Sequence, residues 1–289
     1  NGTPDIAFAD NAGVTTTVQV SDVVGFTELF LQANKNIDVN SALNMTNASG
    51  SVRLEAGNDI NVNSRINAGA VNGNITLTAD NDINVNANIT TGQFGVANIQ
   101  ANADSSGGGN LNIGANIVGY GGVTLSAVNV TQTAGGITTA GNTVVGHAGN
   151  VNIQATGNVN LGTATINAAG TTIGANEGSN GGKVEIIANN GSVTVGNIYT
   201  SGSASGNVIN VGGEGGEVTI NALNDISTGT ITSRSGNSGI NTTASARSGE
   251  VSLTSTAGNL TTGNIASNGG TNNFGANISL SAAGSVTTG

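Results

Sequence analysis

The sequence contains no cysteine, no tryptophan and one proline, and charged residues make up only 8% of its 289 positions. The absence of cysteine excludes disulfides and thiolate metal sites. Aromatic residues make up 2% of the chain, so a core built from many large side chains is excluded as well. No apolar run approaches the roughly 18 residues that a membrane-spanning helix needs, and we therefore expect no membrane span.

Basic residues are the scarcest charged class. Lys and Arg together number 6 against 16 Asp and Glu, which gives a formal net charge of −10 and a pI near 4.1. Nucleic acids and anionic membrane surfaces attract basic patches. The charge balance therefore predicts no nucleic-acid partner.

Small and aliphatic residues are abundant in this sequence. Glycine occurs 47 times, asparagine is nearly as frequent, and the 36% hydrophobic fraction is almost entirely Ala, Val, Ile and Leu. Such a composition is typical either of disordered low-complexity chains or of repeat proteins with a thin aliphatic core. Disorder usually accompanies high charge and little Val or Ile, so this sequence favours an ordered repeat.

One unit recurs along the chain. It begins with an apolar-x-apolar-x-Ala segment (52–56), continues through an Asn/Gly/Asp turn to a second apolar-x-apolar segment (60–62), and reaches a third apolar residue, Ile66. The next copy begins at Ile75. Further copies begin at Leu29, Ile99, Val123, Val151, Val184, Val218, Val251 and Ile278. The period is about 23–24 residues early and roughly 33–34 later, a range typical of solenoids.

Strict alternation within each copy predicts β-strands with one aliphatic and one polar face. Stacked in register, the copies form aliphatic ladders. The first ladder is predicted to contain Val52, Ile75, Ile99, Val123, Val151, Val184, Val218, Val251 and Ile278. The second is predicted to contain Leu54, Leu77, Ala101, Leu125, Ile153, Ile186, Ile220, Leu253 and Leu280. The second strands are predicted to stack Ile60, Ile83, Val159, Val193, Ile226, Leu260 and Val286, and the third Ile66, Ile89, Ile166, Ile198, Ile231 and Ile265.

Three ladders of strands per repeat indicate an all-β fold, a parallel β-helix solenoid of about ten coils with three faces, covering residues 27–289. With strands about 4.8 Å apart, the rod would be near 50 Å long. We expect the glycine-rich stretches 104–110, 174–182, 201–215 and 236–248 to be outward-facing returns or bulges, because a stacked coil tolerates insertions only there.

The two ends of the chain differ from the repeat. Residues 1–26 carry bulky apolar side chains, including Phe8 and Phe26, outside the repeat register. We predict that they form an N-terminal β cap or an assembly segment, since an uncovered sheet edge invites association. The last copy stops at Gly289 within its second strand, which indicates either a continuing rod or head-to-tail self-association into filaments.

The segments 216–229 (GEVTINALNDISTG) and 249–265 (GEVSLTSTAGNLTTGNI) resemble the repeats of filamentous-haemagglutinin-like exoproteins of Gram-negative bacteria, including cyanobacteria. The resemblance extends over nearly all of residues 27–289. It implies a right-handed parallel β-helix exported by two-partner secretion, and a secreted or cell-surface adhesin, stalk or fibre. The Asn-Pro motifs of that family's secretion domain are absent, because the only proline, Pro4, follows Thr3.

Candidate catalytic groups are sparse. His147 is the only histidine and lies in a Gly-rich loop, without the Gly-x-Ser-x-Gly elbow of a serine hydrolase. The densest acidic pairs are Asp80/Asp82 in a turn and Glu214/Glu217 before a strand. Polysaccharide-cleaving β-helices also need Lys or Arg beside such acids, and we expect neither lysine, Lys35 nor Lys183, to belong to such a cluster.

Two further patterns resemble a calcium site and an ice-binding face, but each matches only in part. Asp59 and Asp82 lie about one coil apart, so a shared calcium ion is conceivable, but the Gly-Gly-x-Gly-x-Asp repeat of calcium-binding solenoids is absent. Thr228, Thr262 and Thr288 form a short Thr ladder similar to that of ice-binding solenoids, but it covers too few coils for a flat ice face. We predict no catalytic, cofactor-binding or metal-binding residues.

The sequence thus predicts a structural extracellular or cell-surface rod, adhesin or fibre segment that is not an enzyme. Its polar outer surface is expected to contact carbohydrate or another cell-surface target. The alternative is a β-helix that binds or cleaves polysaccharide, as an enzyme or a phage-type fibre.

Overall fold

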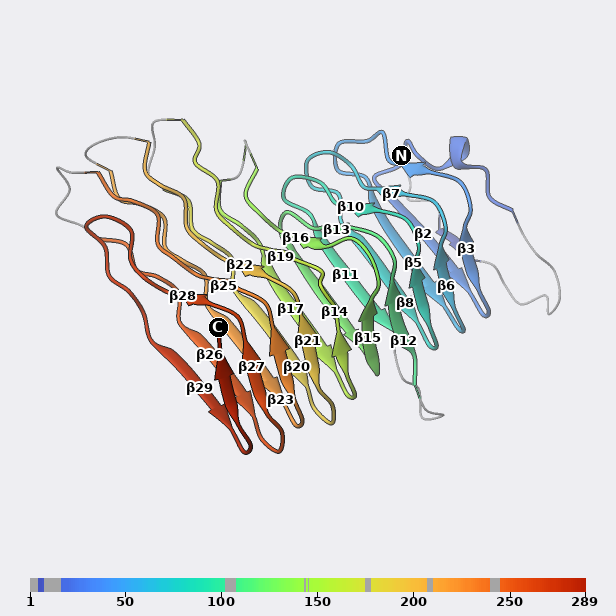
Figure 1. Ribbon diagram of the computed structural model, residues 1–289. Coiled ribbons are helices and arrows are strands. Elements are labelled where there is room, and N and C mark those ends of the chain that lie inside the picture. Colours follow the sequence, from blue (N-terminus) through green and yellow to red (C-terminus); the bar gives the residue numbers. More distant parts are fainter. Residues whose placement is uncertain are drawn as a thin grey trace.

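The computed structural model describes residues 5–7, 17–101, 108–142, 144, 146–174, 178–206, 210–239 and 245–289. Over these residues the chain winds into a stack of coils, and three parallel sheets run along the stack (Figure 1). The only helical element described is one 3-10 turn, η1 (Val20–Asp22). The predicted all-β parallel β-helix with three faces is confirmed.

Each full coil supplies one strand to each sheet, and all the pairings between strands are parallel. Sheet A contains β1 (Asp5–Ala7), β2 (Glu28–Ala33), β5 (Ser51–Ala56), β8 (Ile75–Ala79), β11 (Val96–Ala101), β14 (Gly122–Ala127), β17 (Asn150–Ala155), β20 (Val184–Ala188), β23 (Val218–Ala222), β26 (Val251–Ser255) and β29 (Ile278–Ala282).

Sheets B and C are built from shorter strands. Sheet B contains β3 (Ile37–Val39), β6 (Ile60–Val62), β9 (Ile83–Val85), β12 (Asn110–Ile113), β15 (Asn129–Gln132), β18 (Val159–Asn160), β21 (Val193–Val195), β24 (Ile226–Thr228), β27 (Leu260–Thr262) and β30 (Val286–Thr288). Sheet C contains β4 (Leu43–Asn44), β7 (Ile66–Asn67), β10 (Ile89–Thr90), β13 (Ile117–Val118), β16 (Ile137–Thr138), β19 (Ile166–Asn167), β22 (Ile198–Tyr199), β25 (Ile231–Thr232) and β28 (Ile265–Ala266).

The core is a continuous aliphatic column enclosed by the three sheets. Successive side chains of a strand point to opposite faces, and every second residue is accordingly buried in strands such as β20 and β23. Leu77, Leu125, Ile153 and Ile220 are completely buried. The inward orientation that was predicted for the aliphatic ladders is confirmed for these four residues.

The predicted register is wrong in one coil. Ala97, not Ile99, pairs with Ile75 and Val123, while Ile99 pairs with Leu77 and Leu125. The strand β11 is therefore shifted by two residues from the prediction. Period-two alternation cannot detect such a shift, because a displacement of two residues leaves the same side chains on the same face.

The N-terminal residues add to the stack. The strand β1 pairs in parallel with β2, with Asp5 opposite Phe30, and Val23 is buried in the core. Residues 1–4 and 8–16 lie outside the described residues, as do 104–107 of the predicted bulge at 104–110, whose last residue, Asn110, begins the strand β12. The separate cap over residues 1–26 remains a prediction.

The later returns differ from the outward loops that were predicted. As expected, the described parts of 174–182, 201–215 and 236–248 contain no named strand, and in Figure 1 they extend the later coils on one side. They nevertheless stack on one another: the Ser203 N–H donates to the Ser179 carbonyl and the Gly236 N–H to the Gly213 carbonyl. Ser179, Ser238 and Ser248 are buried. The returns extend the packed cross-section because Gly and Ser let their backbones approach closely.

Hydroxyl groups close several coils between sheet C and sheet A. The buried Thr139 hydroxyl donates to the Gly149 carbonyl at 2.6 Å, and the Thr200 hydroxyl to the Gly216 carbonyl at 2.8 Å. In each case the acceptor glycine precedes a strand of sheet A. These bonds satisfy polar groups that would otherwise be costly to bury.

Candidate functional site

The acidic side chains of the turns between sheets A and B bind backbone groups of the next coil. Asp59 Oδ1 accepts the N–H of Asp82 at 3.1 Å, and Asp82 Oδ1 accepts the N–H of Asn110 at 2.7 Å. Asn129 Oδ1 does the same for the N–H of Asn158 at 2.9 Å. Asp and Asn are therefore equivalent in this position, since both offer an oxygen to the following coil. This role gives Asp59 and Asp82 a structural part in the stack.

His147 occupies a similar position in a later return. Its Nδ1 accepts the backbone N–H of Asn180 at 2.9 Å, and Asn180 Oδ1 accepts the N–H of Glu214 at 2.8 Å. The imidazole thus accepts a backbone N–H of the next coil, as the asparagine side chain of Asn129 does elsewhere. This contact gives the histidine a structural part in the stack.

Lys183 lies in a charged cluster that the sequence did not predict. Its Nζ lies 3.4 Å from Glu217 Oε2 and 3.7 Å from Glu185 Oε1. Parallel pairing brings them together, because Val184 and Val218 are partners. The expectation that Lys183 stands apart from acids is therefore wrong. Asp80 is exposed and separate from this cluster, and Glu214 lies outside it.

This Lys183 cluster is open to solvent. Between 31% and 45% of each of its three side chains is exposed. Ion pairs as exposed as these stabilise a fold by roughly 0.2–1 kcal/mol. Two surface hollows, one lined by residues between Asn116 and Asn167 and one by residues between Asn110 and Thr194, lie elsewhere. The cluster brings a cation and two carboxylates together on an open part of the surface.

Two members of the Thr ladder, Thr228 and Thr262, lie inside the coil, whereas Thr288 is exposed in the last strand. Thr228 and Thr262 are 7% and 3% exposed, and the Thr228 hydroxyl donates to Thr262 Oγ1 at 2.8 Å. Thr228 pairs with the inward-facing Val195 of the preceding coil, and Thr262 pairs with Thr228, so both threonines continue the inner face of sheet B. These two hydroxyls face the core, so they do not form an outer surface of the kind found on ice-binding solenoids.

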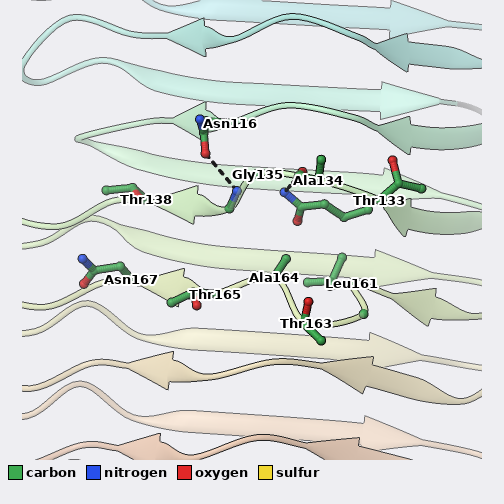
Figure 2. Close-up of a pocket in the computed structure, with 13 residues that line it drawn as sticks. Asn116, Thr133, Ala134, Gly135, Thr138, Leu161, Thr163, Ala164, Thr165 and Asn167 are labelled. Carbon is green, nitrogen blue, oxygen red and sulfur yellow. Dashed lines mark hydrogen bonds between the residues drawn. The ribbon is translucent and has the colours of Figure 1, made fainter.

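A groove lies on the surface between sheets B and C. Its two walls are the turns 133–136 and 162–165, and we call it the turn groove (Figure 2). The corresponding turns in the neighbouring coils are shorter, 114–116 on one side and 196–197 on the other. Gly135 (φ 77°) and Gly162 (φ 55°) adopt the left-handed conformation that lets these two turns bend outward. The groove has a volume of about 710 Å³.

The lining of the turn groove is polar and uncharged. Figure 2 shows Asn116, Thr138, Thr165 and Asn167 in adjacent coils, and the Asn116 carboxamide oxygen accepts the Gly136 N–H at 3.0 Å. The described lining contains no Asp, Glu, Lys, Arg or His. The groove can therefore offer hydroxyl and amide hydrogen bonds, but no charge.

Gln132 also lines the turn groove and occupies an inward-facing position of β15. It is 5% exposed, and its Nε2 donates to the carbonyls of Ala134 at 3.2 Å and Ala115 at 3.4 Å. Its Oε1 is buried without a hydrogen-bond partner. Sequence reasoning missed this residue, although a Gln at an inward position of an apolar-x-apolar strand was a visible signal.

Comparisons with known protein families, curated proteins and solved structures find no match to this chain. Within the described ranges, no helix has the length and hydropathy of a membrane span. Among the same residues, no group of three or more His, Cys, Asp or Glu side chains is placed to hold a metal ion.

Proposed function

We propose that this chain is a structural rod of a secreted or cell-surface protein, of the filamentous-haemagglutinin-like type, and that its outer faces contact other surfaces. The observation that carries the proposal is the unbroken stack of parallel coils in all three sheets. Each coil of a solenoid contacts mainly its neighbours, so length can be added without changing the core. A spacer or fibre needs this property.

The outer faces support the same proposal. Along sheet B, outward positions carry short polar side chains such as Asn61, Asn84 and Asn112, whose amides donate from one coil to the previous one. Such a surface stays hydrated and presents repeated hydrogen-bonding groups to a partner. A stalk or adhesin exposed to solvent along its whole length is expected to have a surface of this kind.

Export and surface location can be tested directly. Antibodies raised against the folded chain should label intact cells of the source organism, and negative-stain electron microscopy of the released protein should show thin rods. A strictly intracellular location would overturn the proposal, as would a compact particle. Treatment of intact cells with protease should remove the antibody signal and leave cytoplasmic proteins undigested.

Self-association by end-to-end stacking is part of the proposal. In β29 and β30, Ile278 and Val286 are 47% and 46% exposed, whereas their equivalents Val251 and Leu260 are buried beneath the next coil. A further coil, from the same chain or from a second copy, would cover these side chains and the unpaired strand edges. Substitution of both residues by Thr should abolish any concentration-dependent lengthening of the rods, and lengthening that persists would contradict this part.

We propose no catalytic role for the Lys183 cluster. The alternative function, polysaccharide cleavage, has this cluster as its best candidate because it combines a cation with Glu185 and Glu217. Its exposure argues against cleavage, since catalytic electrostatics depend on a site that excludes water. Incubation with neutral and acidic polysaccharides should release no new reducing or unsaturated ends. Release that disappears in Lys183→Gln would establish the alternative.

A further inference from the structure

We propose that three short turns on one edge of the stack form a platform for a neutral carbohydrate, in which the side chains of Phe94 and Tyr120 pack against the C–H face of a sugar ring. We call this surface the aromatic corner, and it consists of Val71, Phe94, Val96 and Tyr120. The inference rests on the proposed surface-exposed rod, and it assigns the adhesive contact to one site.

The aromatic corner lies where sheet C passes into sheet A in three successive coils. Its turns join β7 to β8, β10 to β11 and β13 to β14 (Figure 1). The Phe94 N–H donates to the Val71 carbonyl at 2.9 Å. In the next coil the Gly121 N–H donates to the Gly95 carbonyl at 2.8 Å. Phe94 and Tyr120 therefore stand beside each other in adjacent coils, which are about 4.8 Å apart along the stack.

The apolar side chains of the aromatic corner are open to solvent. Aromatic residues make up only 2% of the chain, yet two of them stand together on this edge. Phe94 is 51% exposed, Val96 43% and Val71 37%, and Tyr120 is half-buried. Glycine leaves Val96 uncovered, because its partner is Gly122, where a Cβ would lie only 3.3 Å from Val96 Cγ1. Contiguous apolar patches on a protein surface commonly mark a place of contact.

The size of the aromatic corner indicates a small ligand rather than a second protein. An aromatic side chain offers about 150–250 Å², and the apolar side chains here are at most about half exposed, so the corner presents no more than a few hundred Å². A stable protein interface needs about 800 Å² from each partner. A peptide could also add as a strand, but the Val96 N–H already donates to Asn74 Oδ1 at 2.9 Å.

Charge and polar groups define the chemistry of the ligand. Residues 66–79, 83–101 and 108–142, which build these coils, contain no Asp, Glu, Lys or Arg, so anionic polysaccharides and anionic membranes would find no cation there. The exposed Asn72 and the half-buried Gln93 add carboxamides next to Val71 and Phe94, and carboxamides both donate and accept hydrogen bonds. A sugar has an apolar C–H face and a hydroxyl edge, which match an aromatic face with amides beside it.

The test uses the full chain and neutral gluco-, manno- and galacto-oligosaccharides on an array, followed by titration calorimetry with the best of them. Polyuronate fragments serve as the charged comparison. We expect binding to a neutral set and not to polyuronates. Phe94→Asn copies Asn72 of the preceding coil, and Tyr120→Ala copies Ala148 of the following coil. Each should weaken binding about tenfold or more, equivalent to about 1.4 kcal/mol.

Phe274→Asn is the matched control, because it makes the same substitution at another exposed phenylalanine. Phe274 is 62% exposed, and its bridge partner in the preceding coil is Arg247 rather than an aromatic residue. This variant should bind neutral sugars like the wild type. Circular dichroism checks that each variant is folded. If one of the two corner variants fails to fold, the other still decides the outcome.

Three results would overturn the proposal. The wild type would bind no neutral sugar, or Phe94→Asn and Tyr120→Ala would bind as the wild type does. Alternatively, analytical ultracentrifugation would show a dimer of the wild type that Phe94→Asn abolishes, which would identify a second copy of the chain as the occupant. Antibody labelling of intact cells is independent of the aromatic corner. Loss of the carbohydrate result with surface labelling retained would therefore refute the binding site and leave the rod.

Discussion

Two consecutive isoleucines in β20 offer a matched test of the inward ladders. Ile186 is completely buried between Ile153 and Ile220, while Ile187 lies half-buried on the outer face. Ile186→Ala removes about three carbon groups at about 0.8 kcal/mol each and leaves a cavity. We expect a loss of about 2–5 kcal/mol in the free energy of unfolding, against less than about 1 kcal/mol for Ile187→Ala.

Urea unfolding followed by circular dichroism measures both variants under the same conditions. Repeat proteins can unfold in parts, so amide hydrogen exchange in β17 and β23 should accompany it. Those strands should exchange faster in Ile186→Ala, because they pack directly against the cavity. Equal destabilisation by the two variants, or a greater effect of Ile187→Ala, would refute the assigned register.

Three other changes test polar contacts and close packing. Thr228→Val should destabilise the chain by about 1–3 kcal/mol, because Thr262 Oγ1 loses the Thr228 donor and keeps only its own bond to the Gly263 carbonyl; Thr228→Val/Thr262→Val should recover part of that loss in thermal unfolding. An additive double variant would contradict the buried pair. Gly216→Ala should lower the melting temperature markedly, because its Cβ would lie 2.0 Å from the Gly182 carbonyl oxygen; an unchanged temperature would contradict that approach. Lys183→Gln should change stability by less than about 1 kcal/mol at low salt, and a larger loss would show a stronger cluster.

The strands and their inward faces could be predicted because alternation and repetition both act locally. The pattern at 75–79 repeats that at 52–56, and parallel stacking then places like residues together. The shift at Ala97 could not be predicted, since alternation has the same phase at Ile99 and the two positions differ only in the partners that neighbouring coils offer.

The contacts between residues far apart in the sequence were harder to foresee. Lys183 and Glu217 are 34 positions apart. They meet because the coil between them has the length that places Val184 opposite Val218. The returns looked like independent loops because Gly and Ser carry no hydrophobic signal. Their packing depends on backbone hydrogen bonds, such as that from Gly236 to Gly213, which composition does not reveal.

The most direct test of the stacked rod is a set of distances along one face. Asp38, Asn160, Ser227 and Thr261 are exposed outer residues of sheet B, and the chain has no native cysteine to interfere with labelling. Spin labels at cysteines replacing Asp38 and each of the other three would be measured by pulsed electron paramagnetic resonance. At about 4.8 Å per strand, the backbone separations should rise steadily, to about 24, 34 and 38 Å. A distance to Thr261 shorter than that to Asn160 would show that the chain folds back, and would contradict the rod.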